Sequence, residues 1–270
     1  MVAFPPKSSR HEGVFARRSR GENLEATFVY FSCRVTDMTG HLDSTANAVA
    51  RSVIQSRGQF FDIDDFPDLP RGAVARSLSR LVEDGELRRV RRGVYWSGTK
   101  TPLGIAPPPP MAVLSHIYGP SAPVGPARLD AAGMLGLTSQ VGALPTFAVP
   151  FLIEGLTINL VNRERRRDRS TQRLNATEVA LLEVLDGWDE LVEVPMPTAI
   201  SRIAEFIDGG GIRPERIAPG ANSEPPANRE LLRWILRSAK RTDAANVIRP
   251  AAREVSRMNA LRSLGSLVNA

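Results

Sequence analysis

The sequence predicts an α+β protein in which an N-terminal winged helix-turn-helix is followed by a mixed α/β C-terminal domain. Residues 44–96 show helix-like apolar spacing that gives way to two short strand-like runs. Four consecutive prolines at positions 107–110 then interrupt the pattern, because proline fits neither a helix interior nor a central strand. Beyond them, strand-like and helix-like segments are mixed up to about residue 238.

A chain of 270 residues is longer than most single domains, so we expect more than one. The predicted order is an arm at 1–40, the winged helix-turn-helix at 41–99, a Pro-rich linker at 100–110, the α/β domain at 111–238 and an amphipathic helix or tail at 239–270. The arm is rich in proline, serine and arginine without periodicity. It is either a disordered basic arm or the result of a start codon placed too early, upstream of the true one.

Each element of the N-terminal module has a local signal. Ser44 is an N-cap residue before the apolar positions of a first helix, and residues 63–66 form a short second helix that Pro67 ends. Pro70 suits the first turn of a third helix, which Gly85 closes. Strands at 87–90 and 94–96 then form a hairpin whose tip is the wing.

Arginine dominates the outward positions of the third helix and the hairpin. The candidate DNA-binding residues are Arg71, Arg76, Ser79, Arg80, Arg88, Arg89, Arg91 and Arg92. A helix with small and basic outward residues can enter a major groove, while basic wing residues neutralise phosphates. The alternative is a solvated surface helix beside a basic hairpin.

The C-terminal part predicts helices and strands in alternation. Asn175 and Glu178 form a capping box that opens one helix. Strand-like runs at 146–149 and 152–161 predict strands, with Gly155 at the turn of a hairpin within the second run. Further helices are expected at 111–118, 129–135, 198–207 and 228–236, and after residue 250.

The charge of the chain favours an acidic partner. The formal net charge is +6 and the isoelectric point about 10.2. Lysine occurs only at positions 7, 100 and 240, so arginine carries nearly all the positive charge; a GC-rich genome would also produce this usage. A second basic run at 163–173 either touches nucleic acid or is merely solvated, and an acidic segment follows at 178–208.

Several classes of function have no support in the sequence. Cys33 is the single cysteine and the three histidines are scattered, so we expect neither a disulfide nor a metal site. No phosphate-binding loop, nucleophile elbow or zinc-protease motif occurs, so we expect no enzyme activity and no cofactor. No apolar run approaches the length of a membrane span, and a cytoplasmic location is expected.

Four segments of the chain have a recognisable pattern: GQFFDIDDF at 58–66, AVARSLSRLVEDGELRRVRRGVYW at 73–96, AAGMLGLTSQV at 131–141 and LIEGLTINLVNR at 152–163. Through these segments, residues 44–238 resemble the AbiEi-like antitoxins of type IV toxin–antitoxin systems. The first two are shared with related winged-helix regulators, and the third discriminates better. The arm and the last thirty residues lie outside the resemblance.

The resemblance implies a bacterial antitoxin that binds double-stranded operator DNA, represses its own operon and counteracts a cognate nucleotidyltransferase toxin. It also implies that the eight residues named above read the operator, with the protein bound as monomer or dimer and toxin contact left open. The alternative is a protein-interaction or RNA-binding module in which the winged domain is mainly a scaffold. In that case residues 163–173 would contact RNA or a partner.

Overall fold

The computed structural model describes residues 44–255 and residue 258, which belong to one compact unit, Asp43–Ala270. The arm predicted at 1–40 and most of the helix predicted after residue 250 lie outside the described residues. Within the described part the fold is α+β, as the sequence predicts. No helix in that part is both long and apolar enough to cross a bilayer.

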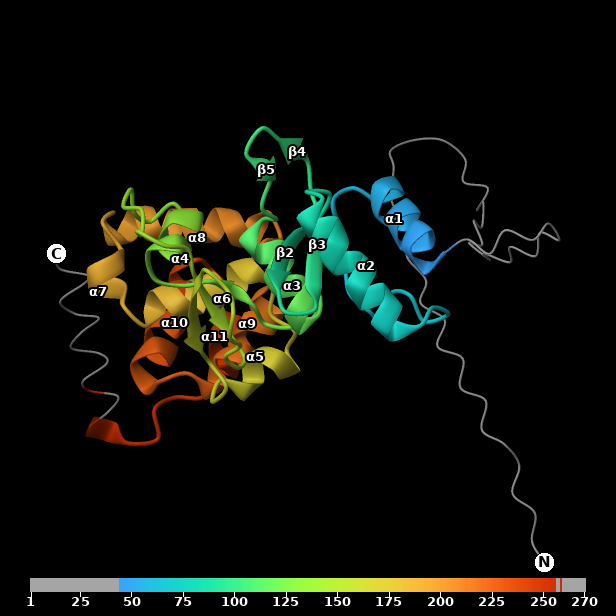
Figure 1. Ribbon diagram of the computed structural model, residues 1–270. Coiled ribbons are helices and arrows are strands. Elements are labelled where there is room, and N and C mark those ends of the chain that lie inside the picture. Colours follow the sequence, from blue (N-terminus) through green and yellow to red (C-terminus); the bar gives the residue numbers. More distant parts are fainter. Residues whose placement is uncertain (1–43, 256–257, 259–270) are drawn as a thin grey trace, which may run out of the picture. The chain divides into compact units, whose positions relative to one another are not determined.

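The N-terminal module consists of two helices against a small antiparallel sheet (Figure 1). Its elements are α1 (Thr45–Gln55), β1 (Gln59–Phe61), α2 (Arg71–Glu83), β2 (Arg88–Arg91) and β3 (Val94–Ser97), with strand order β1-β3-β2. The Ser44 side chain caps α1 by accepting a hydrogen bond from the Asn47 amide. Apolar side chains of all these elements except β2, with Phe66 and Leu87, form one core: Val49, Val53, Phe61, Phe66, Val74, Leu78, Leu81, Leu87 and Tyr95.

The predicted second helix at 63–66 is wrong: residues 62–70 form turns. The Asp62 amide donates to Asp65 Oδ2 and the Asp64 amide to Asp62 Oδ1, each at 2.7 Å. Aspartate side chains thus close local turns with the backbone of this segment, a hydrogen-bonding habit that favours turns for this residue type. Phe66 is buried in the module core all the same.

The segment predicted as a linker at 100–110 is largely structured. It contains a hairpin of β4 (Lys100–Thr101) and β5 (Gly104–Ile105), and its last proline is the first residue of α3 (Pro110–Tyr118). The indole Nε1 of Trp96 donates to the Ala106 carbonyl at 3.0 Å. This bond ties the segment to β3.

A second sheet follows in the order β6 (Gly125–Pro126), β7 (Thr146–Val149) and β8 (Asn159–Asn162). Strands β7 and β8 are parallel. Residues 150–158 contain no strand, so the hairpin predicted around Gly155 is wrong. Residues 150–158 instead form the crossover connection that a parallel pair requires. Leu156 and Ile158, whose apolar alternation suggested a strand, pack against the small core of Leu114, Val124, Phe147 and Val149.

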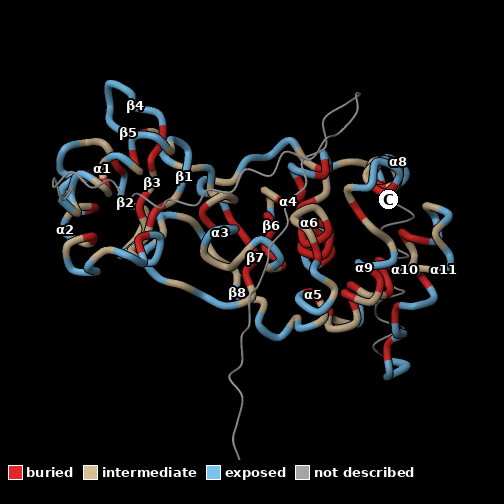
Figure 2. Tube along the Cα trace, turned by 90° about the vertical axis from the view of Figure 1, so that its right-hand side faces the viewer, coloured by how far each residue is buried: buried red, intermediate tan, exposed pale blue. Residues whose placement is uncertain are grey.

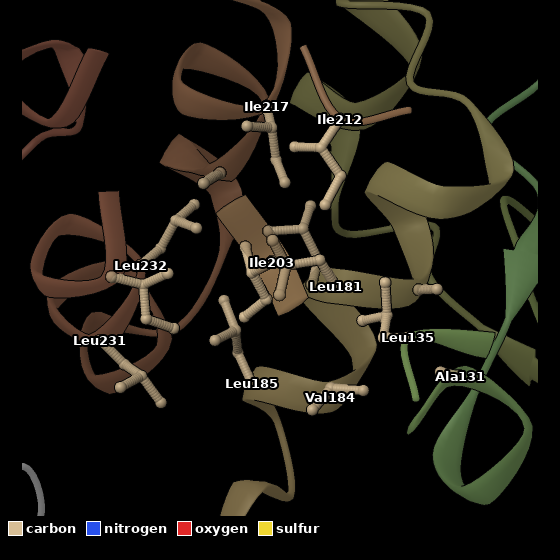
Figure 3. Packing of buried hydrophobic residues seen from close by; sticks show 14 of the residues in the cluster. Ala131, Leu135, Leu181, Val184, Leu185, Ile203, Ile212, Ile217, Leu231 and Leu232 are labelled. Atoms are coloured by element: carbon tan, nitrogen blue, oxygen red, sulfur yellow. The ribbon is translucent and has the colours of Figure 1, made fainter. Parts of the chain in front are cut away.

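The remaining helices lie around α6 (Ala176–Leu185), the most deeply buried helix of the fold. They are α4 (Arg128–Met134), α5 (Arg167–Thr171), α7 (Trp188–Leu191), α8 (Met196–Asp208), α9 (Pro214–Gly220), the 3₁₀ turn η1 (Ala221–Ser223), α10 (Pro226–Ser238) and α11 (Thr242–Val247). The predicted capping box is confirmed, because the side chains of Asn175 and Glu178 each accept from the other residue's amide. Figure 2 shows α6 as almost continuously buried, and Figure 3 shows its Leu181, Val184 and Leu185 among side chains of neighbouring helices.

Candidate nucleic-acid interface

The outward face of α2 is set by the residues that the helix buries. Val74, Leu78 and Leu81 pack into the module core, so the opposite side leaves Arg76, Ser79 and Arg80 exposed. Gly72 lies one turn before Arg76. A Cβ atom at Gly72 would lie 3.8 Å from Arg76 Nη1, so this guanidinium reaches back over the first turn of the helix.

Four of the predicted arginines keep their guanidinium groups available. Within residues 44–255 and 258, the side chains of Arg76, Arg80, Arg89 and Arg92 form no hydrogen bond or ion pair, and all four are exposed. Arg71 differs, because its Nη1 is paired with Asp64 Oδ1 of the preceding turn. Both partners of that pair are largely exposed, so the pair adds little to stability.

The pleat of the sheet separates Arg88 from Arg89. Residues directly opposite each other on paired strands share a face. Arg89 lies opposite Tyr95, which is buried against the helices, whereas Arg88 lies opposite Trp96 on the other face. Arg88 Nη1 also donates to the Ile105 carbonyl at 3.2 Å, so Arg88 anchors the β4–β5 hairpin.

That other face of the sheet is covered by aromatic contacts with the segment that follows. The Phe60 ring lies 4.7 Å from the ring of Trp96 and stacks on His116 of α3 at 4.6 Å, measured between centroids. The face that carries Arg88 is therefore partly covered by α3. Arg88 does not share the face of α2.

At the tip of the hairpin, Arg92 is exposed but Arg91 is not. A bulge between Arg89 and Arg91 shifts the register, and Arg91 is half-buried. A Cβ atom at Gly155 would lie 4.0 Å from Arg91 Cβ, which places Arg91 against the crossover loop. Burial raises the pKa of Tyr118 above its ordinary value, and the charge of Arg91 opposes this shift. Of the eight predicted residues, Arg76, Ser79, Arg80, Arg89 and Arg92 thus remain exposed on the helix and hairpin without such contacts.

The second basic run, at 163–173, is used largely inside the protein. Arg163 binds Glu183 through two hydrogen bonds of 2.7 Å, and Arg169, only 2% exposed, donates to Glu183 at 2.6 Å and to Glu224 at 2.7 Å. Arg166 Nε lies 3.2 Å from the second oxygen of Glu224. Hydrogen bonds to Glu183 raise the pKa of Arg163. Burial alone would lower the pKa of Arg169, but the charges and hydrogen bonds of Glu224 and Glu183 outweigh burial, so the pKa of Arg169 is also raised.

Part of the acidic segment at 178–208 has the matching internal role. Glu178 is fully buried and binds Arg213 at 2.8 Å, and Glu183 holds the two arginines described above. The sequence shows a basic run followed by an acidic one, but not that members of the two runs pair in the interior. Among the described residues, no group of three His, Cys, Asp or Glu side chains is placed to hold a metal ion.

Comparisons with known proteins give no family. No protein-family model matches the chain, and no curated protein matches it. Among solved structures, the chain is similar to the crystal structure of the RV2827C protein from Mycobacterium tuberculosis, with 12% identity over 81% of this chain and 93% of that one and a TM-score of 0.41. A likeness at this level carries no conclusion about the function of the chain.

Proposed function

We propose that residues 44–97 are a winged helix-turn-helix that binds double-stranded DNA. The observation that carries this proposal is the set of exposed, unpaired guanidinium groups of Arg76, Arg80, Arg89 and Arg92 on a helix and an adjacent hairpin of one module. The order of elements, a helix, a strand, a second helix and a two-stranded hairpin, supports the winged helix. Turns at 62–70 would replace its usual second helix.

In this proposal α2 enters the major groove and the hairpin tip contacts phosphates. Arg76 lies over Gly72 on the first turn, the part of a recognition helix that is nearest the bases. Arg92 is at the tip beside Gly93, whose positive φ of 82° suits a tight turn. Base contacts specify a sequence, whereas phosphate contacts supply affinity that salt weakens.

We further propose, from the resemblance to AbiEi-like antitoxins, that the protein represses its own operon and counteracts a nucleotidyltransferase toxin. The support for this finer assignment is the set of sequence segments given above together with the proposed DNA-binding module. A neighbouring nucleotidyltransferase reading frame whose product is toxic alone and harmless with this protein would be the direct genetic test.

The DNA assignment is tested by fluorescence anisotropy with the full chain, its own promoter fragment and a random duplex of equal length. Arg76→Ala is expected to lose about 1–3 kcal/mol of promoter binding and much of the discrimination between the duplexes. Arg92→Ala is expected to weaken binding to both duplexes alike. It should also reduce the slope of log affinity against log salt concentration by about 1.

Arg88→Ala is the matched control, since Arg88 is exposed but lies on the opposite face of the sheet. It should leave both affinities nearly unchanged. If Arg76→Ala and Arg92→Ala behave like Arg88→Ala, the assignment of helix and wing is wrong. Binding of RNA in preference to both duplexes would favour the alternative function, for which internal pairing of Arg163, Arg166 and Arg169 leaves less basic surface.

A further inference from the structure

The arginines that pair with Glu183 and Glu224 border a small cavity in the C-terminal part. The cavity has a volume of about 130 Å³. It is lined by Arg163, Arg166, Arg167, Arg169 and Ser170, by Glu164, and by Pro123 and Pro150. Four arginines therefore border one small space.

The lining arginines keep N–H donors that the protein does not fill. Arg169 donates from Nε and Nη1 to carboxylates, and its Nη2 makes no hydrogen bond with the described residues. Arg163 uses Nε and Nη2, and Arg166 uses Nη1 on the Ser223 carbonyl with Nε beside Glu224. These remaining N–H groups are available to donate charge-assisted hydrogen bonds to oxygen atoms of a ligand in the cavity.

The carboxylates that hold these arginines also fix their orientation. Glu183 and Glu224 are both 1% exposed in their side chains and neither lines the cavity, so they hold the guanidinium groups from behind. Asp186, which is 37% exposed, also contacts Arg163. With Glu164 these carboxylates balance the four arginines in number, so binding would depend on directed N–H donors rather than on a large excess of charge.

The size of the cavity limits what can enter. A water molecule occupies about 30 Å³, and sites for whole drug-sized ligands span about 300–1,000 Å³. A cavity of about 130 Å³ therefore suits a tetrahedral oxyanion but not a nucleoside. Arginine is the side chain whose planar N–H groups match phosphate oxygens.

We propose that this cavity is a binding site for a phosphate group, either free phosphate or the terminal phosphate of a larger molecule that stays outside the cavity. Arg169, Arg163 and Arg166 donate from fixed positions, and Arg167, which forms no ion pair within the described residues, closes the site from the exposed side. The proposal is independent of DNA binding by the N-terminal module.

Isothermal titration of the full chain with inorganic phosphate tests the site, with chloride at equal ionic strength as reference. Saturable heat is expected with phosphate and not with chloride, and sulfate, a dianion of the same shape, should compete. Arg167→Ala is expected to weaken binding at least about tenfold. Arg165→Ala is the matched control, because Arg165 is exposed on the same segment but does not line the cavity.

A pair of oligonucleotides that differ only in a 5′-phosphate tests whether the site takes free phosphate or the terminal phosphate of a larger molecule. Competition by the phosphorylated strand alone assigns a terminal phosphate, and competition by neither assigns a free one. The proposal is overturned if phosphate gives no saturable heat, or if Arg167→Ala and Arg165→Ala bind it equally. Promoter binding by Arg167→Ala should be unchanged, so failure here is distinguishable from failure of the DNA-binding proposal.

Discussion

Replacing Arg169 by methionine should destabilise the C-terminal part more than any loss of a surface ion pair. Arg169 is 2% exposed, and Glu183 and Glu224, its two partners, are 1% exposed in their side chains. Removing one member of a buried ion pair costs about 3–5 kcal/mol, because the remaining charge stays desolvated. Methionine keeps much of the volume, so the loss is mainly electrostatic.

The structure places the expected loss at the lower end of that range. Glu183 would keep both hydrogen bonds from Arg163, and Glu224 would keep Arg166 at 3.2 Å. We therefore expect about 3 kcal/mol for Arg169→Met. The control is Arg241→Ala, whose pair with Asp208 is 41% and 66% exposed and should be worth at most about 1 kcal/mol.

Urea titration followed by tryptophan fluorescence measures both losses. A Trp96→Phe background leaves Trp188 and Trp234, which belong to the C-terminal core or pack against it, as the reporters. With a slope of about 3 kcal/mol per molar, the expected loss moves the midpoint by about 1 M. If Arg169→Met lowers the midpoint no more than Arg241→Ala does, the ion-pair cluster does not stabilise the fold in the way argued here.

Three other outcomes are expected. Gly125→Ala should destabilise the protein by about 1–3 kcal/mol, because the added Cβ would lie 2.6 Å from the Ala176 carbonyl oxygen. Gly133→Ala in α4 is the control: its Cβ would meet nothing within 4 Å, so it should stabilise the protein slightly. Thermal unfolding compares the two variants. Hydrogen bonds from Gln140, Ser139 and Thr138 lower the pKa of Glu193 from 4.5 to about 2. The contribution of Glu193 to stability is thus present above pH 4.5 and lost as pH falls towards 2. Protection of the amides at 138–140, measured as exchange relative to the intrinsic rate at each pH, should therefore fall over that range, and Glu193→Gln should remove the dependence. Asn175→Ala should cost about 1 kcal/mol of unfolding free energy by removing the cap of α6, measured by urea titration.

The sequence predicted correctly those elements that depend on interactions between residues close together in the chain. The capping box at Asn175, the start of α2 beside Pro70 and the apolar stripe of α2 follow from neighbours within one helical turn. The turns at 62–70 were missed because the side chains of Asp62 and Asp65 close them by accepting from backbone amides, which apolar spacing does not reveal. The crossover at 150–158 was missed because apolar alternation reports burial, and here the burial is against a core rather than in a strand pair.

The exposure of the candidate DNA-binding residues also has local causes for some residues and tertiary causes for others. Exposure of Arg76, Ser79 and Arg80 follows from the helical repeat of α2 alone. Which face Arg88 and Arg91 take depends on the register of β2 with β3 and on the bulge between Arg89 and Arg91. Neither is visible in a run of arginines, so the sequence could not separate Arg88 from Arg89.

By itself, the sequence determined the α+β class, most helix positions and the basic outward face of α2, because each depends on spacing and propensity within one segment. Only the tertiary structure decided the parallel pairing of β7 with β8 and the use of Arg169 as a buried structural cation. The two carboxylates that bind Arg169 are 14 and 55 residues away in the chain. The free energy of a buried ion pair depends on which partners share the same water-free space, and that is a property of the folded chain.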